Sequence, residues 1–203
     1  MHTVDDHERE VKFFIADLKE ISSRLLTIGA VVTKERVHEY NLRFDTPDQK
    51  LRSKHQVLRL RQDDQTRLTF KDRADVSQGV ADRQELEITV ADFKSTQKIL
   101  EALGFTVFMI YEKFRTTYGY KGCEIVVDEL PFGLFVEIEG VTEDAIKTVA
   151  SDLKFNWEKR ILLSYLDLFN ILKINKDMRI VYLTFDNFVG TKFTEADFVG
   201  KVG

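Results

Sequence analysis

The stretch Glu8-Arg9-Glu10-Val11-Lys12 decides how the rest of the sequence is interpreted. In a β-strand successive side chains point to opposite faces, so Glu8, Glu10 and Lys12 share one face. Two carboxylates about 7 Å apart on one strand repel each other unless a cation lies between them. A divalent metal that holds a phosphate would satisfy both carboxylates, and Lys12 would bind the same anion from the side. Alone the pattern is weak, because a charged strand face is more often simply in contact with water.

The composition indicates one globular domain of ordinary or large size. The chain has 203 residues, of which 43% are hydrophobic and 32% charged, enough to bury a substantial core. Only two prolines and ten glycines argue against linkers and long disordered regions. The formal net charge of −4 does not favour a polyanion as partner, so an anionic ligand would require locally segregated charge and a metal.

Neither a disulfide nor a membrane segment is predicted. Cys123 is the single cysteine, so we expect a small packing residue in a strand rather than a disulfide or a cysteine-rich metal cluster. No apolar stretch approaches the ~20 residues that cross a bilayer, and no signal-like run of basic and then apolar residues opens the chain. We therefore expect a cytoplasmic protein without a membrane partner.

Hydrophobic periodicity and capping residues predict many short strands and a few helices. Asp17 caps the first helix and Gly29 ends it. The pattern indicates an α+β fold, whose eight or so antiparallel strands can close into a barrel. The helices are predicted at residues 18–28, 93–103, 142–153 and 161–174, and the strands at 8–15, 30–44, 57–62, 66–72, 85–90, 106–111, 112–118, 124–128 and 134–139.

The predicted strands carry like-charged pairs on one face and apolar side chains on the other. An ordinary amphipathic sheet would instead mix the signs to relieve repulsion. Acidic pairs suit a hard cation such as Mg²⁺ or Mn²⁺, and basic pairs suit phosphate oxygens. With helices on the apolar face, the charged face would line the barrel and form a metal-assisted polyphosphate site. The pairs are Glu8/Glu10, Arg59/Arg61, Glu85/Glu87, Lys113/Arg115 and Glu137/Glu139, joined by Lys71 and Asp128.

In order and spacing, these motifs resemble those of the CYTH superfamily, the triphosphate tunnel metalloenzymes. The match runs from about Glu8 to Leu172, about four-fifths of the chain, and the segment after Lys173 lies outside it. One such motif is weak, whereas all of them in order are highly specific. They are Glu8-x-Glu10-x-Lys12, Leu58-Arg59-Leu60-Arg61, Thr69-Phe70-Lys71, Glu85-x-Glu87, Lys113-x-Arg115, Asp128-Glu129-Leu130 and Phe135-Val136-Glu137-Ile138-Glu139-Gly140.

The resemblance implies an eight-stranded antiparallel barrel, open as a tunnel, that binds a triphosphate with Mg²⁺ or Mn²⁺. Residues 1–173 would form this domain and residues 174–203 a C-terminal extension of unassigned role. The implied metal ligands are Glu8, Glu10, Asp128, Glu137 and Glu139, with Glu85 and Glu87 as acidic support. The implied phosphate ligands are Lys12, Arg59, Arg61, Lys71, Lys113, Arg115 and, just before the last helix, Arg160.

The activities known in the superfamily leave several reactions open. As a triphosphatase, the protein would hold phosphate with basic residues, and a second metal or a lysine of lowered pKa, Lys12 or Lys71, would activate water. As a class IV adenylyl cyclase, it would hold ATP for attack by the ribose 3′-oxygen. The complete acidic set disfavours a binding module without turnover, and the lack of a basic stripe disfavours RNA 5′-triphosphatase activity. We interpret the site first as that of a hydrolase.

The sequence does not identify the organic group that the triphosphate substrate carries. Several aromatic residues near predicted strand ends could stack on adenine or thiazolium, although such residues more often pack in a core or rim. They are His38, Tyr40, Phe44, Tyr118 and Phe132. The expected partner is a small-molecule triphosphate and not a long nucleic acid. The oligomeric state stays open, with a homodimer as one option.

Overall fold

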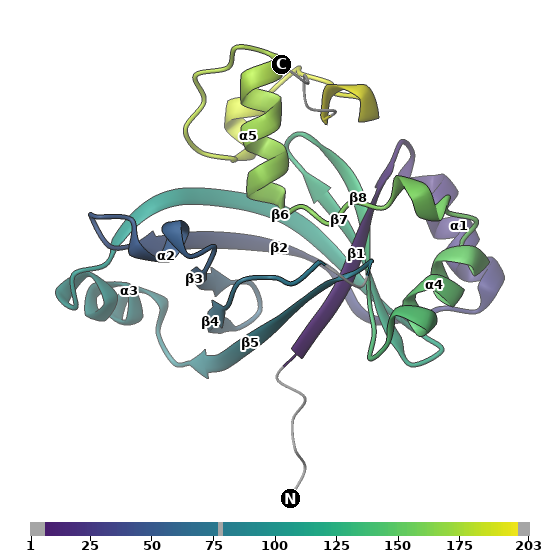
Figure 1. Cartoon of the computed structure of the whole chain (residues 1–203), viewed down its shortest axis with the longest axis horizontal. Helices are drawn as coiled ribbons and strands as arrows, with labels where there is room; N and C mark the ends of the chain where they lie inside the picture. The colour runs from purple at the N-terminus through teal and green to yellow at the C-terminus, as the bar shows by residue number, and fades with distance from the viewer. Residues whose placement is uncertain (1–6, 77–78, 199–203) are drawn as a thin grey trace, which may run out of the picture.

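Eight antiparallel strands close into a barrel in the computed structural model, which describes residues 7–76 and 79–198 (Figure 1). Around the barrel the strands follow the order β1-β5-β4-β3-β2-β6-β7-β8. The predicted α+β barrel is therefore confirmed. The strands are β1 His7–Ile15, β2 Val31–Asp45, β3 Val57–Gln62, β4 Thr66–Lys71, β5 Ala81–Val90, β6 Thr106–Tyr120, β7 Cys123–Leu130 and β8 Gly133–Glu139.

Two strands of 15 residues, β2 and β6, form the longest ladder of the barrel. They pair from Val31 opposite Gly119 to Asp45 opposite Thr106. The sequence predicts two strands within β6, divided at Glu112, and this is wrong. No glycine, proline, asparagine or aspartate stands near Glu112 to turn the chain, so the ladder continues through it.

The helices cover the outer, apolar face of the barrel. Helices α1 (Leu18–Ile28) and α4 (Glu143–Asp152) pack on β1, β7 and β8, and α3 (Phe93–Ala102) packs beside β2 and β3 (Figure 1). Within β1, Val11 and Phe13 enter this core while Glu10 and Lys12 face the interior. Burial of each such apolar side chain contributes about 1.5–3 kcal/mol. Packing of the outer face thereby fixes the charged face inside.

Predicted capping residues determine where the helices begin. The side chain of Asp17 accepts hydrogen bonds from the first turn of α1, and Gly29 ends this helix with a φ of 81°. Helix α5 spans Tyr165–Asn175, so the predicted start at Ile161 is wrong. Ser164 and Asp167 form a reciprocal capping box, and Ile161 instead pairs with Lys12 of β1. A four-residue helix, α2 (Lys50–Ser53), precedes β3.

Residues 176–198 return to the barrel and pack on it through two 3₁₀ turns, Phe185–Phe188 and Glu195–Phe198. Leu183 donates its backbone N–H to Ile110 O at 2.9 Å and accepts one from Glu112 N at 2.9 Å, so it pairs with β6. Phe188 and Phe198 join the core formed by α5 and the β7–β8 hairpin. The described part of the extension thus packs on the barrel and pairs with β6 at Leu183.

None of the helices among the described residues combines the length and the apolar character that crossing a bilayer requires.

Candidate active site

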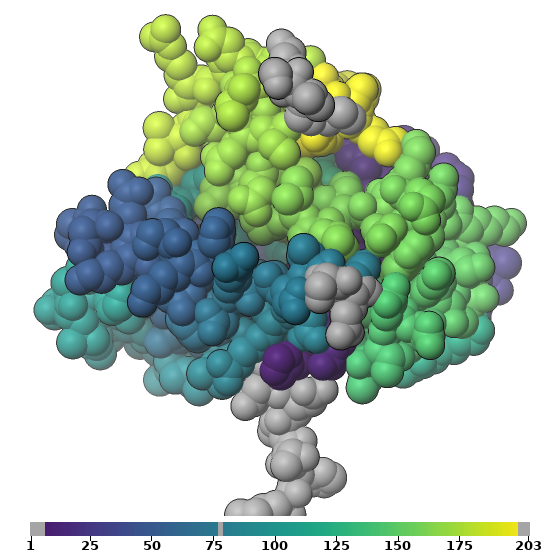
Figure 2. Space-filling model, in the orientation of Figure 1, coloured from purple at the N-terminus to yellow at the C-terminus, as the bar shows by residue number. Residues whose placement is uncertain are grey.

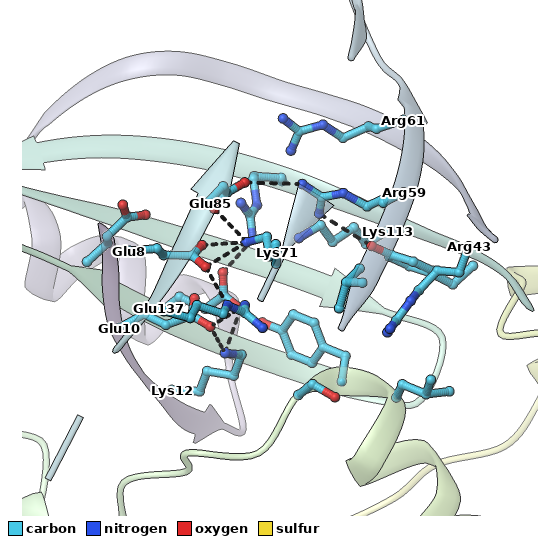
Figure 3. Close-up of a pocket in the computed structure, with 18 of the residues that line it drawn as sticks. Glu8, Glu10, Lys12, Arg43, Arg59, Arg61, Lys71, Glu85, Lys113 and Glu137 are labelled. Carbon is cyan, nitrogen blue, oxygen red and sulfur yellow. Dashed lines mark hydrogen bonds and ion pairs between the residues drawn. The ribbon is translucent and has the colours of Figure 1, made fainter. Parts of the chain in front are cut away.

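The charged interior of the barrel encloses a cavity of about 350 Å³. In Figure 2 the surface is hollowed between α2, the start of α5 and the β4–β5 connection. Figure 3 shows carboxylate and basic side chains converging there from several strands. Most predicted site residues line the cavity, namely Glu8, Glu10, Lys12, Arg59, Arg61, Lys71, Glu85, Glu87, Lys113, Arg115, Glu137 and Glu139.

Glu8 lies between two cations on neighbouring strands. Lys71 Nζ donates to Glu8 Oε1 and Oε2 at 2.6 and 2.7 Å, and it lies 2.8 Å from Glu85 Oε2. Arg83 Nε donates to Glu8 Oε2 at 2.8 Å. Burial raises the pKa of Glu8, but the charges of Lys71 and Arg83 outweigh burial and hold this pKa well below its usual value. Glu8 is therefore ionised, and the contacts of Lys71 are those of an ammonium donor.

Lys12 does not have the lowered pKa that the predicted role as a base requires. Its Nζ donates to Glu10 Oε1 at 2.6 Å and lies 3.3 Å from Glu137 Oε1. Burial lowers the pKa of Lys12, but the charges of Glu10 and Glu137 outweigh burial and raise it above the usual value. In this structure the carboxylate neighbours of Lys12 therefore oppose the predicted loss of its proton. A permanently charged ammonium group at this place is suited to binding phosphate instead.

The basic pair on β3 lies on the opposite side of the cavity. Arg59 Nη2 donates to Thr69 Oγ1 at 3.2 Å, and Arg61 Nη1 donates to Glu39 Oε1 at 3.3 Å. The buried Nε atoms of Arg43, Arg59 and Arg61 have no hydrogen-bond partner among the described residues. A buried donor without a hydrogen-bond partner lowers the stability of the fold. These N–H groups are therefore available to a bound anion.

Asp128 was predicted to ligate metal, but its carboxylate already holds the basic pair of β6. Asp128 accepts hydrogen bonds from Lys113 Nζ at 2.9 Å, Arg115 Nε at 2.7 Å, Arg115 Nη2 at 2.5 Å and Tyr165 Oη at 2.9 Å. It has no exposed surface and does not line the cavity. In this structure Asp128 therefore positions two predicted phosphate ligands and carries no free oxygen for an ion.

Arg160 lies outside the cavity, contrary to its predicted role as a phosphate ligand. Its Nε donates to Gly79 O at 2.8 Å and its Nη1 to Trp157 O at 3.0 Å. The guanidinium also lies over the Trp157 ring, 4.9 Å from the centroid. These contacts fasten the segment before α5 to the β4–β5 connection. The last helix was predicted to begin at Ile161, directly after Arg160, whereas Ile161 pairs with Lys12 of β1 and α5 begins at Tyr165.

The carboxylates of the cavity are oxygen ligands of the type that a hard divalent cation prefers. Burial and the charges of Glu8, Glu10 and Glu124 raise the pKa of Glu139 to about 8. A cation bound by these oxygen donors would relieve the repulsion. Within residues 7–76 and 79–198, no three such side chains converge on one point. Glu8 and Glu10 point to basic partners instead, and binding an ion requires them to turn from these partners.

Sequence reasoning missed several residues that line or support the cavity. Glu39, Asn41 and Arg43 alternate along β2 in the same manner as the other charged pairs, so their parity was a usable signal. Arg83 fell in a segment adjacent to the predicted β5, which begins earlier than expected, at Ala81. Tyr111 and Tyr165 also line the cavity, and nothing in their local sequence distinguishes them from core tyrosines.

A second cavity of about 420 Å³, here called the outer basin, adjoins the first at the mouth of the barrel. The two share Glu10, Arg43, Val57, Arg83, Ser164 and Leu166 and are therefore continuous. The outer basin is strongly basic, and its lining contains no phenylalanine, tyrosine or tryptophan among the described residues. Its charged and titratable residues are Glu10, Arg43, Arg52, His55, Arg73, Arg83 and Asp167.

Comparison with known proteins agrees with this geometry. A family model described as the CYTH domain matches residues 6–164. The chain belongs to the CYTH family. A Methanocaldococcus jannaschii protein named as a candidate adenylate cyclase is 24% identical over 171 residues, which cover 84% of this chain and 91% of that protein.

Solved structures share the CYTH fold at low sequence identity. A candidate adenylate cyclase of Vibrio parahaemolyticus has a TM-score of 0.73 at 20% identity, covering 81% of this chain and 98% of its own. A Hippeastrum protein, described as an adenylyl cyclase candidate with dominant triphosphatase activity, has a TM-score of 0.64 at 20% identity, covering 80% of this chain and 95% of its own. These likenesses establish the fold and leave the reaction of this CYTH protein to its own residues.

Proposed function

We propose that this CYTH protein is a metal-dependent enzyme that hydrolyses a triphosphate held inside its barrel. The observation that carries the proposal is a continuous interior surface on which paired basic side chains face paired carboxylates. Such a surface neutralises a highly charged anion and still offers oxygen ligands to a cation. A protein that only bound anions would have no use for Glu8, Glu10, Glu137 and Glu139 on the same surface.

The basic residues would bind and orient the substrate. Lys12 and Lys113 approach the same tyrosine ring, that of Tyr165, at 5.5 and 5.4 Å from its centroid. Arg59 and Arg61 lie opposite them on β3. Fixed cations on both sides can hold the non-bridging phosphate oxygens in line and stabilise the charge that develops during displacement. In this reaction water adds to the terminal phosphorus, the bond to the bridging oxygen breaks, and a proton is released.

Glu8, Glu10, Glu137 and Glu139 are the residues that would hold Mg²⁺ or Mn²⁺. When bound, such an ion would neutralise phosphate charge and lower the pKa of water. Binding the substrate would help, because phosphate oxygens compete with the carboxylates for Lys12 and Lys71 and so release Glu10 and Glu8. The basic residues would then bind phosphate, and the carboxylates that they release would bind the metal ion.

A class IV adenylyl cyclase reaction is the second candidate, since similar proteins are named as candidate adenylate cyclases. Few aromatic side chains are placed to stack on an adenine ring, since among the described residues the only ones that line the inner cavity are those of Tyr111 and Tyr165. Phe44 and Phe132, two of the aromatic residues considered for stacking, are both 1% exposed and pack in the core. The described lining of the outer basin contains no aromatic side chain except His55. This favours hydrolysis over cyclisation.

The test is to incubate purified protein with Mg²⁺ or Mn²⁺ and, separately, tripolyphosphate, thiamine triphosphate and ATP. Phosphate release without cyclic AMP is expected, whereas cyclic AMP with equimolar pyrophosphate would establish the cyclase instead. Glu10→Gln should abolish turnover while the circular dichroism spectrum stays unchanged. Glu35→Gln, at an exposed position outside the cavity, is the matched control. Full activity of Glu10→Gln would exclude the assigned metal site.

A further inference from the structure

One basic residue of the inner cavity differs from all the others. The lysines and arginines that line this cavity lie within 4 Å of a carboxylate oxygen, with the exception of Arg43, as far as residues 7–76 and 79–198 show. In Figure 3 the guanidinium of Arg43 lies apart from the network of dashed contacts. Among the described residues, Arg43 is thus the one cation of this cavity that has no carboxylate oxygen within 4 Å.

The surroundings of Arg43 do not compensate for its charge. It lies opposite Arg59 on β3 and opposite Met109 on β6. Among the described residues its buried Nε has no hydrogen-bond partner, and its guanidinium lies 5.7 Å from the centroid of the Phe108 ring. Burial and the nearby charges of Arg59 and Arg83 lower the pKa of Arg43 from its usual value, and they outweigh Tyr111 and Asp167, which raise it. A cation held beside other cations is stabilised when an anion binds.

The position of Arg43 relates it to the outer basin. It lines both cavities, at the point where the inner one opens into the basin. Arg52, His55 and Arg73 lie on the rim of the basin. Its two carboxylates are already engaged, because Glu10 accepts from Lys12 and Asp167 closes the capping box of α5. Of the four arginines of the basin, Arg52 is paired with Asp45 at 2.9 Å and Arg83 with Glu8 at 2.8 Å. The excess positive charge of the basin therefore rests on Arg43 and Arg73.

We propose that Arg43 and the outer basin bind a further phosphate, so that the preferred substrates carry four or more phosphates in a row. This proposal rests on the proposed function. The terminal phosphates would occupy the inner cavity, and the fourth would contact Arg43. Water would add to the terminal phosphorus, the oxygen bridging to the next phosphorus would leave with the shortened chain, and one proton would be released. Thiamine triphosphate places a cationic thiazolium at the same point and would be repelled.

The experiment compares initial rates with inorganic tripolyphosphate, inorganic tetrapolyphosphate and adenosine 5′-tetraphosphate. A charged hydrogen bond contributes about 1.5–3 kcal/mol, so the KM for tetrapolyphosphate should be about tenfold or more below that for tripolyphosphate. Arg43→Met should remove most of this difference, and Arg43→Lys, which keeps the charge, should retain part of it. Arg36→Met is the control, since Arg36 pairs with Glu129 outside the cavity. Comparison of the two tetraphosphates shows whether the chain is inorganic or ends in a nucleoside.

Several results would overturn the proposal. Equal KM values for the two inorganic chains in the wild-type protein would do so. An equal rise of both values in Arg43→Met, abolished by high salt, would show that Arg43 only attracts anions at a distance. If no chain is hydrolysed, the proposed function fails, and thermal unfolding then decides the matter. Greater protection by tetrapolyphosphate, lost in Arg43→Met, would support the basin as a binding site, and equal protection would refute it.

Discussion

Replacing Asp128 with asparagine should destabilise the protein more than any exposed charge change. The carboxylate of Asp128 accepts four hydrogen bonds from Lys113, Arg115 and Tyr165 and is fully buried. An asparagine keeps one oxygen for part of this set, but it removes the negative charge and turns an N–H group toward another donor. Removing one partner of a buried ion pair costs about 3–5 kcal/mol, and the retained acceptor places the expected loss near 3 kcal/mol.

Urea unfolding measures this loss in the fluorescence of Trp157, the single tryptophan. With a slope of about 2 kcal/mol per molar urea, the midpoint should fall by about 1.5 M. Asp48→Asn is the control, because Asp48 lies 3.2 Å from Lys50 in an exposed pair, and exposed ion pairs contribute little to stability. Adding tripolyphosphate should reduce the difference between the wild-type protein and Asp128→Asn, since phosphate supplies negative charge near Lys113 and Arg115.

The same measurement distinguishes a positioning role from a role as metal ligand. A residue that acts only on a metal would leave the urea midpoint unchanged in the presence of EDTA. An unchanged midpoint in Asp128→Asn under those conditions would therefore refute our reasoning about the buried cluster. The predicted role of Asp128 as a metal ligand would then be the better account.

Three further predictions concern other parts of the molecule. Burial raises the pKa of Glu39, but the charges of Lys113, Arg115 and Arg61 outweigh burial and lower this pKa from an ordinary 4.5 to about 2. Ionised Glu39 therefore stabilises the fold above pH 4.5, and this contribution is lost as the pH falls toward 2. Urea titrations should show that Glu39→Gln flattens this acid dependence, worth about 3 kcal/mol; an unchanged slope would contradict the assignment. Arg160→Ala should leave the KM for tripolyphosphate within twofold, whereas Arg59→Ala should raise it at least tenfold, and equal effects in steady-state kinetics would return Arg160 to the site. Leu183→Ala should lower the free energy of unfolding by about 2–4 kcal/mol, because Leu183 is 1% exposed, and a loss below 1 kcal/mol in the urea assay would show that the extension is only loosely attached.

Alternation along the strands was enough to predict the charged interior. Each strand side chain must face one of two sides, so the apolar outer face of Val11 and Phe13 assigns Glu10 and Lys12 to the inside. The same rule, applied to β2, would have placed Glu39 and Arg43 in the barrel. They were missed because Glu39 and Arg43 have opposite charge and flank a neutral Asn41, which does not look like a charged pair.

The pairing of charges inside the barrel was beyond local sequence patterns. Lys71 meets Glu8 from 63 positions away, and Lys113 meets Asp128 across a hairpin. Strand order and register determine which charged side chains come into contact. These contacts in turn determine the direction in which the pKa of each buried group shifts. Lys12 illustrates the point, because burial and nearby cations were expected to lower its pKa, whereas the charges of Glu10 and Glu137 raise it. The start of α5 was also misplaced, since Ile161 and Leu162 extend the apolar pattern beyond the capping box.

The backbone pairing of Leu183 with β6 has a consequence for how the protein is made. Strand β7 pairs with β6 only from Phe114 onward, so the earlier half of β6 has one edge without a neighbouring barrel strand. An open edge can recruit strands from other molecules. During synthesis at about 5–20 residues per second, the segment around Leu183 follows the end of β8 by several seconds. Until this segment docks, the newly made barrel exposes the unpaired edge of β6, which can bind strands of other molecules. The lining of the cavity also lacks Leu183 until then.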